Sequence, residues 1–136
     1  MYEFHGWAVL RYHTHDTNEQ LQEEAFLQFE QYIKETDKMN LSIIKRYNGQ
    51  DSFLITGLHN HYAVYVLEIF EWIATHLPGA YGLLYVHDDE AGDDINENQF
   101  VVWKLARGKL EKVKDPFLSP YIPAVEDSYD PSRDDD

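Results

Sequence analysis

The sequence contains no cysteine, and this absence excludes disulfide bonds and metal sites built on thiolates. It also lacks any apolar run near the roughly 20 residues that a membrane-spanning helix needs. Residues 1–4, Met-Tyr-Glu-Phe, do not begin a basic and then apolar segment of the kind that directs secretion. These absences together predict a protein of the reducing cytoplasm, with no membrane partner.

Basic residues are scarce, with 11 Lys and Arg against 25 Asp and Glu, so the formal net charge is −14. A surface of this sign repels phosphate backbones, which argues against nucleic acid as a ligand. The same charge attracts cationic proteins and speeds their association. Solubility alone remains an alternative explanation of the charge.

Sequence signatures of catalysis are also missing: there is no Gly-x-Ser-x-Gly motif, no phosphate-cradling glycine loop and no cysteine nucleophile. Residues 13–16, His-Thr-His-Asp, place two potential metal ligands two residues apart, but a site there needs a third ligand such as His87 or Asp88. Polar loop histidines are the favoured interpretation, and the metal site is the alternative. Residues 59–61, His-Asn-His, predict a loop in which Asn60 caps a helix. We therefore expect no catalytic residue, no bound metal and no cofactor.

With 136 residues and 43% hydrophobic content, the chain is expected to form one globular domain, residues 1–125, followed by an acidic, solvated tail, residues 126–136. Alternating and helical apolar patterns predict the order β-α-β-β-α-β-β. The fold class is α+β, a two-layer sandwich with a mixed, mostly antiparallel sheet and two helices on one face. The expected strands are residues 2–13, 41–47, 52–58, 80–86, 100–106 and 109–114, and the expected helices run from Asp16 or Thr17 to 36–38 and from Asn60 to Pro78.

Three local features of the sequence each carry a separate structural prediction. Asn48-Gly49 predicts a tight two-residue hairpin. Gly6 leaves a gap in the first strand, which predicts either a bulge or a close approach by a helix. Trp7 and Trp103 are expected on the open sheet face or under residues 115–123, whose three prolines predict an extended segment laid against the body.

The strand near residue 80 runs directly into a cluster of acidic residues. His87, Asp88, Asp89 and Glu90 end it, and Asp93 and Asp94 follow. Neighbouring carboxylates raise one another's pKa and a histidine can act as acid or base, while carboxylate oxygens also suit Mg²⁺ or Ca²⁺. No second acidic motif matches this cluster, so a solvated or partner-facing acidic rim is the favoured interpretation.

Four motifs together resemble the Imm7 family of bacterial immunity proteins: residues 2–8 (Tyr-Glu-Phe-His-Gly-Trp-Ala), 85–90 (Tyr-Val-His-Asp-Asp-Glu), 105–110 (Leu-Ala-Arg-Gly-Lys-Leu) and 115–120 (Asp-Pro-Phe-Leu-Ser-Pro). The resemblance runs from Tyr2 to about Ile122. It implies a small acidic α+β protein encoded beside a polymorphic or contact-dependent toxin, which it neutralises by binding. The family offers no catalytic residues to transfer.

The resemblance therefore implies a cytoplasmic, non-enzymatic protein whose partner is a cognate toxin domain, expected to be cationic and of the nuclease type. Oligomeric state is left open. The alternative function is a small metal-dependent hydrolase or regulatory binding module that uses His87 and the neighbouring carboxylates. The hypothesised toxin-binding residues are His87, Asp88, Asp89, Glu90, Asp93, Asp94 and Trp7, with the acidic tail as a further contributor.

Overall fold

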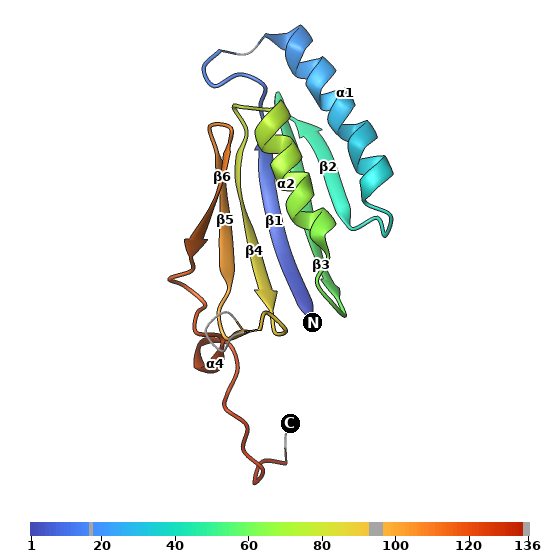
Figure 1. Cartoon of the computed structure of the whole chain (residues 1–136). Coiled ribbons are helices and arrows are strands. Elements are labelled where there is room, and N and C mark those ends of the chain that lie inside the picture. The colour runs from blue at the N-terminus through green and yellow to red at the C-terminus, as the bar shows by residue number, and fades with distance from the viewer. Residues whose placement is uncertain (17, 93–96, 135–136) are drawn as a thin grey trace.

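The structure, a computed structural model, describes residues 1–16, 18–92 and 97–134. Within these residues the chain forms one six-stranded sheet with helices on one of its faces (Figure 1). The strand order across the sheet is β2-β3-β1-β4-β5-β6. The elements are β1 (Tyr2–Leu10), α1 (Glu19–Thr36), β2 (Ser42–Tyr47), β3 (Gln50–His59), α2 (Val64–His76), β4 (Tyr81–Asp88), β5 (Val101–Ala106), β6 (Lys109–Lys114) and the short α4 (Tyr121–Ala124).

The predicted fold class is confirmed: this is an α+β architecture, with α1 and α2 packed on the same face of the sheet (Figure 1). One detail is corrected: the sheet was expected to be mixed and mostly antiparallel, but the five strand pairings in the described residues are all antiparallel. β4 lies between β1 and β5, as its apolar sequence predicted for an interior strand. No helix in the described residues is long and apolar enough to cross a bilayer.

Two hairpins use the same turn chemistry. Asn48 and Gly49 have φ angles of 52° and 75°, and they join Tyr47 directly to its cross-strand partner Gln50. Arg107 and Gly108 repeat these angles, 52° and 75°, between β5 and β6. Positive φ at both central residues matches the right-handed twist of the flanking strands. The predicted Asn-Gly hairpin is therefore confirmed.

The helix starts differ from the sequence expectation. Asn18, rather than Asp16, caps α1, because its side-chain oxygen accepts a hydrogen bond from the backbone N–H of Leu21 at 3.1 Å. Thr17, the other expected cap, lies outside the described residues. α2 begins after Ala63 without a side-chain cap, so the prediction that Asn60 caps it is wrong.

The core lies between the helices and the sheet, where Phe4, Phe29, Phe53 and Phe70 are fully buried. Gly6 of β1 makes room for α2: a Cβ at this position would lie 2.7 Å from Cζ of Phe70. The β1–β3 register is unbroken from Tyr2 to Leu10, so close helix packing rather than a bulge explains the glycine.

The two undecided tryptophans lie on opposite faces. Trp7 of β1 is on the open face, away from the helices, whereas Trp103 of β5 packs against the core under them. The segment after β6 covers one end of the open face, and it includes α4, a short kinked helix where an extended segment had been expected. From Glu126 the described residues are exposed and lead away from the body (Figure 1).

Candidate interaction surface

The predicted acidic rim lies where β4 ends, at the same end of the molecule as the N-terminus and α4 (Figure 1). The carboxylates of Asp89 and Glu90 both accept hydrogen bonds from the Met1 amine, and Glu90 Oε1 also lies 3.2 Å from Nδ1 of His61. The pKa of the Met1 amine is raised, mainly because Asp89 accepts its hydrogen bond. Part of the negative charge of the rim is thus balanced internally.

Of the other acidic rim residues, the structure describes Asp88. Asp88 Oδ1 accepts a hydrogen bond from the backbone N–H of Glu90 at 2.9 Å, which tightens the turn after β4. Asp93 and Asp94 lie outside the described residues. The structure therefore brings Asp88, Asp89 and Glu90 together at one end of the sheet.

His87 serves a packing role that the sequence did not reveal. Its Nε2 donates to the backbone oxygen of Glu97 at 2.7 Å, and its ring stacks on Tyr121 with centroids 4.3 Å apart. His87 and Asp88 also point to opposite faces of β4, because successive strand residues alternate. A hydrolytic acid–base pair of these two neighbours is therefore disfavoured.

The hypothesised metal site that joins His13 and His15 to His87 or Asp88 is wrong. A Cβ on Gly79 would lie 1.9 Å from the backbone oxygen of His13, so His13 lies at the beginning of β4. His87 lies at the other end of this eight-residue strand, roughly 20 Å away at the usual rise per residue. Among the described residues no group of three His, Asp or Glu side chains is placed to hold a metal ion.

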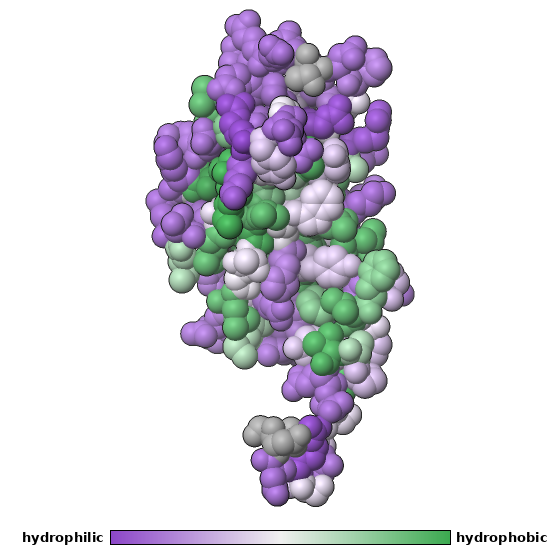
Figure 2. Space-filling view, turned by 180° about the vertical axis from the view of Figure 1, so that it is seen from behind, coloured by the Kyte–Doolittle hydropathy of each residue, from purple (hydrophilic) through white to green (hydrophobic). Residues whose placement is uncertain are grey.

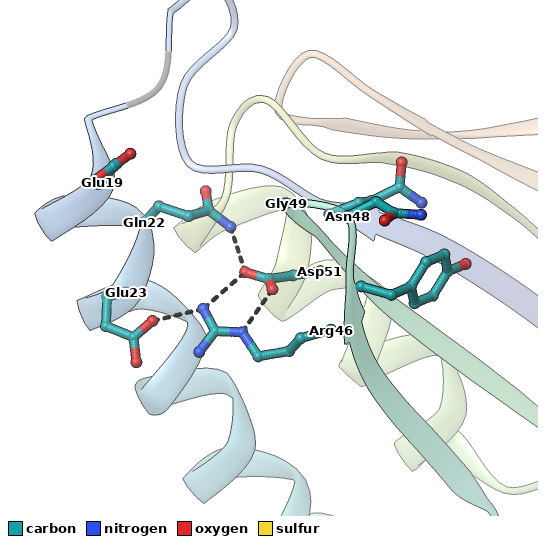
Figure 3. A pocket seen from close by; sticks show the side chains of 9 residues that line it. Glu19, Gln22, Glu23, Arg46, Asn48, Gly49 and Asp51 are labelled. Carbon is teal, nitrogen blue, oxygen red and sulfur yellow. Dashed lines mark hydrogen bonds and ion pairs between the residues drawn. The ribbon is translucent and has the colours of Figure 1, made fainter.

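A polar pocket of about 590 Å³ lies at the opposite end of the molecule, between the start of α1 and the β2–β3 hairpin (Figure 3). Asp51, only 7% exposed, accepts hydrogen bonds from Arg46 Nε at 2.7 Å and from Gln22 Nε2 at 2.9 Å. Arg46 also reaches Glu23 on α1. The hydrogen bond from Arg46 lowers the pKa of Glu23, and its two carboxylate partners raise the pKa of Arg46.

These contacts make the pocket a structural clasp. Gln22 additionally donates to the backbone oxygen of Leu10 and accepts from the N–H of Tyr12, so it joins α1 to the end of β1. Sequence reasoning missed this cluster, although a signal was available. Arg46 and Asp51 are cross-strand partners in the register that the Asn-Gly turn imposes.

The open face of the sheet carries a row of apolar side chains across four strands. The register aligns Ile43 of β2, Leu54 of β3, Trp7 of β1 and Leu83 of β4. Figure 2, viewed from the side opposite the helices, shows hydrophobic residues gathered across the middle of this face. Trp7 is 41% exposed and meets Tyr81 edge to face, with centroids 6.2 Å apart.

Trp7 was the only member of this row singled out from the sequence, and it lies apart from the acidic rim. Its β4 partner, Leu83, precedes His87 by four residues, which corresponds to roughly 13 Å along the strand. Those of the hypothesised toxin-binding residues that the structure describes therefore lie in two areas, the acidic end of β4 and the apolar centre of the open face.

Among known proteins, this chain matches one family of sequences. No curated protein and no solved structure matches the chain. Its sequence does match the family described as immunity protein 7 (Imm7) over residues 1–127 of 136, which is most of its length. This protein therefore belongs to the immunity protein 7 family.

Proposed function

We propose that this protein is a non-enzymatic cytoplasmic inhibitor that binds a cationic, nuclease-type toxin domain through its acidic surface. The family membership implies an immunity protein against a toxin and carries the proposal. The contact surface comprises His87, Asp88, Asp89, Glu90, Asp93, Asp94 and Trp7. The toxin is the product of a neighbouring gene of a polymorphic or contact-dependent system.

Charge supports the choice of partner. The net charge of −14 attracts a cationic domain and raises the rate of encounter above that of a neutral pair. Nuclease domains carry basic surfaces because their substrates are polyanions. An inhibitor of this sign therefore competes for the surface that nucleic acid would occupy.

Cell survival tests the function directly. The toxin domain encoded beside this chain is expressed from an inducible promoter, with or without this protein, and viable cells are counted. Protection by this protein, together with a complex of the two purified chains, is the expected result. Toxicity that is unchanged in its presence would show that it is not the inhibitor of that toxin.

Charge placement is tested with two matched sets of substitutions. The rim set is Asp89→Asn, Glu90→Gln, Asp93→Asn and Asp94→Asn. The control set, Glu24→Gln, Glu35→Gln, Glu68→Gln and Glu71→Gln, removes the same four charges from exposed positions on the helices. We expect the rim set to slow association with the toxin several-fold more than the control set at low salt, with the difference shrinking as salt is added. Equal effects of both sets would place the interface elsewhere.

A further inference from the structure

The apolar row on the open face lacks a structural explanation. Ile43, Leu54 and Trp7 are 52%, 49% and 41% exposed, although β3 and β1 are interior strands. An antiparallel sheet with one solvated face ordinarily carries polar side chains there. A large contiguous apolar patch on a folded domain is a mark of interaction sites and ligand-binding grooves.

Beside this row the face is hollowed. The short side chain of Thr56 and the ring of His5 occupy the next register position, and the cavity of about 370 Å³ is also lined by Trp7, Leu54 and Tyr85. This volume lies within the range of sites that take up a compact group. The hollow is therefore large enough to receive a protruding side chain of a partner.

Both ring nitrogens of the histidine in the hollow already have hydrogen-bond partners. His5 Nδ1 lies 2.6 Å from Oγ1 of Thr56, and His5 Nε2 lies 2.6 Å from Oε2 of Glu3. Neither ring nitrogen needs a hydrogen bond from a ligand. The hollow therefore favours an apolar occupant, since a polar one would find few free partners.

The described parts of the chain itself do not cover this area. The C-terminal segment is fixed at the far end of the face, where Tyr121 stacks on His87 and the backbone N–H of Phe100 donates to Oγ of Ser119. After α4 the chain leads away from the sheet (Figure 1). None of the described segments fills this area, so the candidate occupants are other molecules.

Net charge distinguishes two candidate occupants. A second copy would bring another −14 to the interface, and the acidic ends of both copies would repel each other. A cationic partner is attracted by the same charge. Glu3 lies on the same face of β1 as Trp7, between the row and the end of β4 where the acidic rim lies, so the two areas belong to one surface.

We propose that this hollow receives an apolar side chain of the cationic toxin domain, with Trp7, Leu54 and Ile43 as the anchor of the interface. The inference rests on the proposed function and identifies the face used. In this arrangement the acidic rim governs how fast the complex forms, and the apolar row governs how slowly it dissociates.

Affinity measurements on the full chain test the anchor. Leu54→Asp places a charge in the hollow, and Leu27→Asp is its matched control, because Leu27 on α1 is equally exposed at 53%. The probe is the toxin domain encoded beside this chain, inactivated by substitution, and surface plasmon resonance measures both the dissociation constant and the dissociation rate. We expect Leu54→Asp to weaken binding at least 100-fold through faster dissociation, and Leu27→Asp to change it less than threefold.

Milder variants guard against misfolding. Trp7→Ala and Ile43→Ala should each weaken binding roughly tenfold, as truncation of a central anchor does, while Leu58→Ala, outside the hollow and 57% exposed, should not. Thermal unfolding of each variant checks the fold. The milder variants decide the outcome where Leu54→Asp does not fold.

The outcomes are distinguishable. Wild-type affinity in the Leu54, Trp7 and Ile43 variants overturns the proposal but leaves the proposed function intact. Failure of the wild-type chain to bind or protect overturns both. A wild-type dimer in sedimentation that Leu54→Asp separates identifies a second copy as the occupant and overturns the proposal.

Discussion

Replacement of Asp115 by alanine should release the C-terminal segment from the sheet. Asp115 follows β6 and is only 6% exposed. Its Oδ1 accepts from the N–H of Phe117 at 2.9 Å and from the hydroxyl of Tyr85 at 3.2 Å. Its Oδ2 accepts from the N–H of Leu118 and the hydroxyl of Ser119, both at 2.9 Å. One carboxylate thus holds the turn and ties it to β4.

The expected loss of stability follows from these donors. A hydrogen bond to a charged acceptor contributes about 1.5–3 kcal/mol. This turn lies at the surface, so water can hydrogen-bond some of the donors that Asp115→Ala leaves without a partner. We take about 1 kcal/mol for each of the three donors in the turn, so Asp115→Ala should lower the free energy of unfolding by about 3 kcal/mol. Asp115→Asn keeps one accepting oxygen and should lose about half as much.

Urea unfolding followed by tryptophan fluorescence measures this change. Asp130→Ala is the matched control, because the Asp130 carboxylate also accepts from a backbone N–H and a hydroxyl, both of Ser132, but is exposed in the tail. Its unfolding midpoint should equal that of the unsubstituted chain. An Asp115→Ala midpoint equal to that of the control would refute the reasoning.

The stabilisation by Asp115 should also depend on pH. Burial alone raises the pKa of this carboxyl, but the hydrogen bonds from Phe117, Leu118, Ser119 and Tyr85 outweigh burial and lower it below its usual value of 3.8. A lowered folded-state pKa means that the stabilisation is fully present above about pH 4 and is lost as the pH falls through the folded value. The stability difference between the unsubstituted chain and Asp115→Asn should therefore be constant from pH 7 to pH 5 and shrink below pH 4, whereas a constant difference down to pH 2.5 would contradict the assignment.

Other substitutions probe the clasp and the glycines. Arg46→Ala leaves the buried Asp51 with Gln22 as its side-chain partner and should lower the free energy of unfolding by about 2 kcal/mol. This value is lower than for a fully buried ion pair because Arg46 is partly exposed. In a double-mutant cycle with Asp51→Ala, most of the loss should be coupling energy between the two residues, and additive losses would contradict the clasp. Gly82→Ala should prevent correct pairing of β1 and β4, because its Cβ would lie 2.0 Å from the backbone oxygen of Trp7, and circular dichroism should show lost structure. The added Cβ of Gly49→Ala would meet no atom within 4 Å, so the only cost is the φ of 75° at this position. The free energy of unfolding should fall by about 1 kcal/mol, which the shift of the thermal midpoint measures.

Much of the fold could be predicted from the sequence because local patterns determine it. Asn48-Gly49 sets both the turn and the strand register, which places Arg46 opposite Asp51. The helical spacing of apolar residues predicted the bounds of α1 and α2 to within a few residues at each end. The start of α1 was less predictable, since Asp16, Thr17 and Asn18 are all residue types that cap helices well, and the structure has Asn18 as the cap.

The candidate site was harder to predict because it depends on which faces strands share. Alternation shows that Trp7 and His5 lie together, but only the pairing of β1 with β3 and β4 shows that Leu54 and Leu83 extend their surface. His87 stood out as a potential acid or base, yet its stacking on Tyr121 depends on a contact 34 positions away in the chain. Long-range contacts of this kind have no local signature.

The arrangement of charge also explains why the open face, rather than a sheet edge, is suited to association. Both edge strands carry basic side chains that oppose pairing with another strand, Lys45 on β2 and Lys109, Lys112 and Lys114 on β6. The exposed positions of α1 are mostly acidic or amide-bearing, which suits solvent contact. Within the described residues, the apolar row around Trp7 consists of large, exposed side chains at the centre of a broad surface. Burial of such residues at the centre of an interface is what makes a protein complex dissociate slowly.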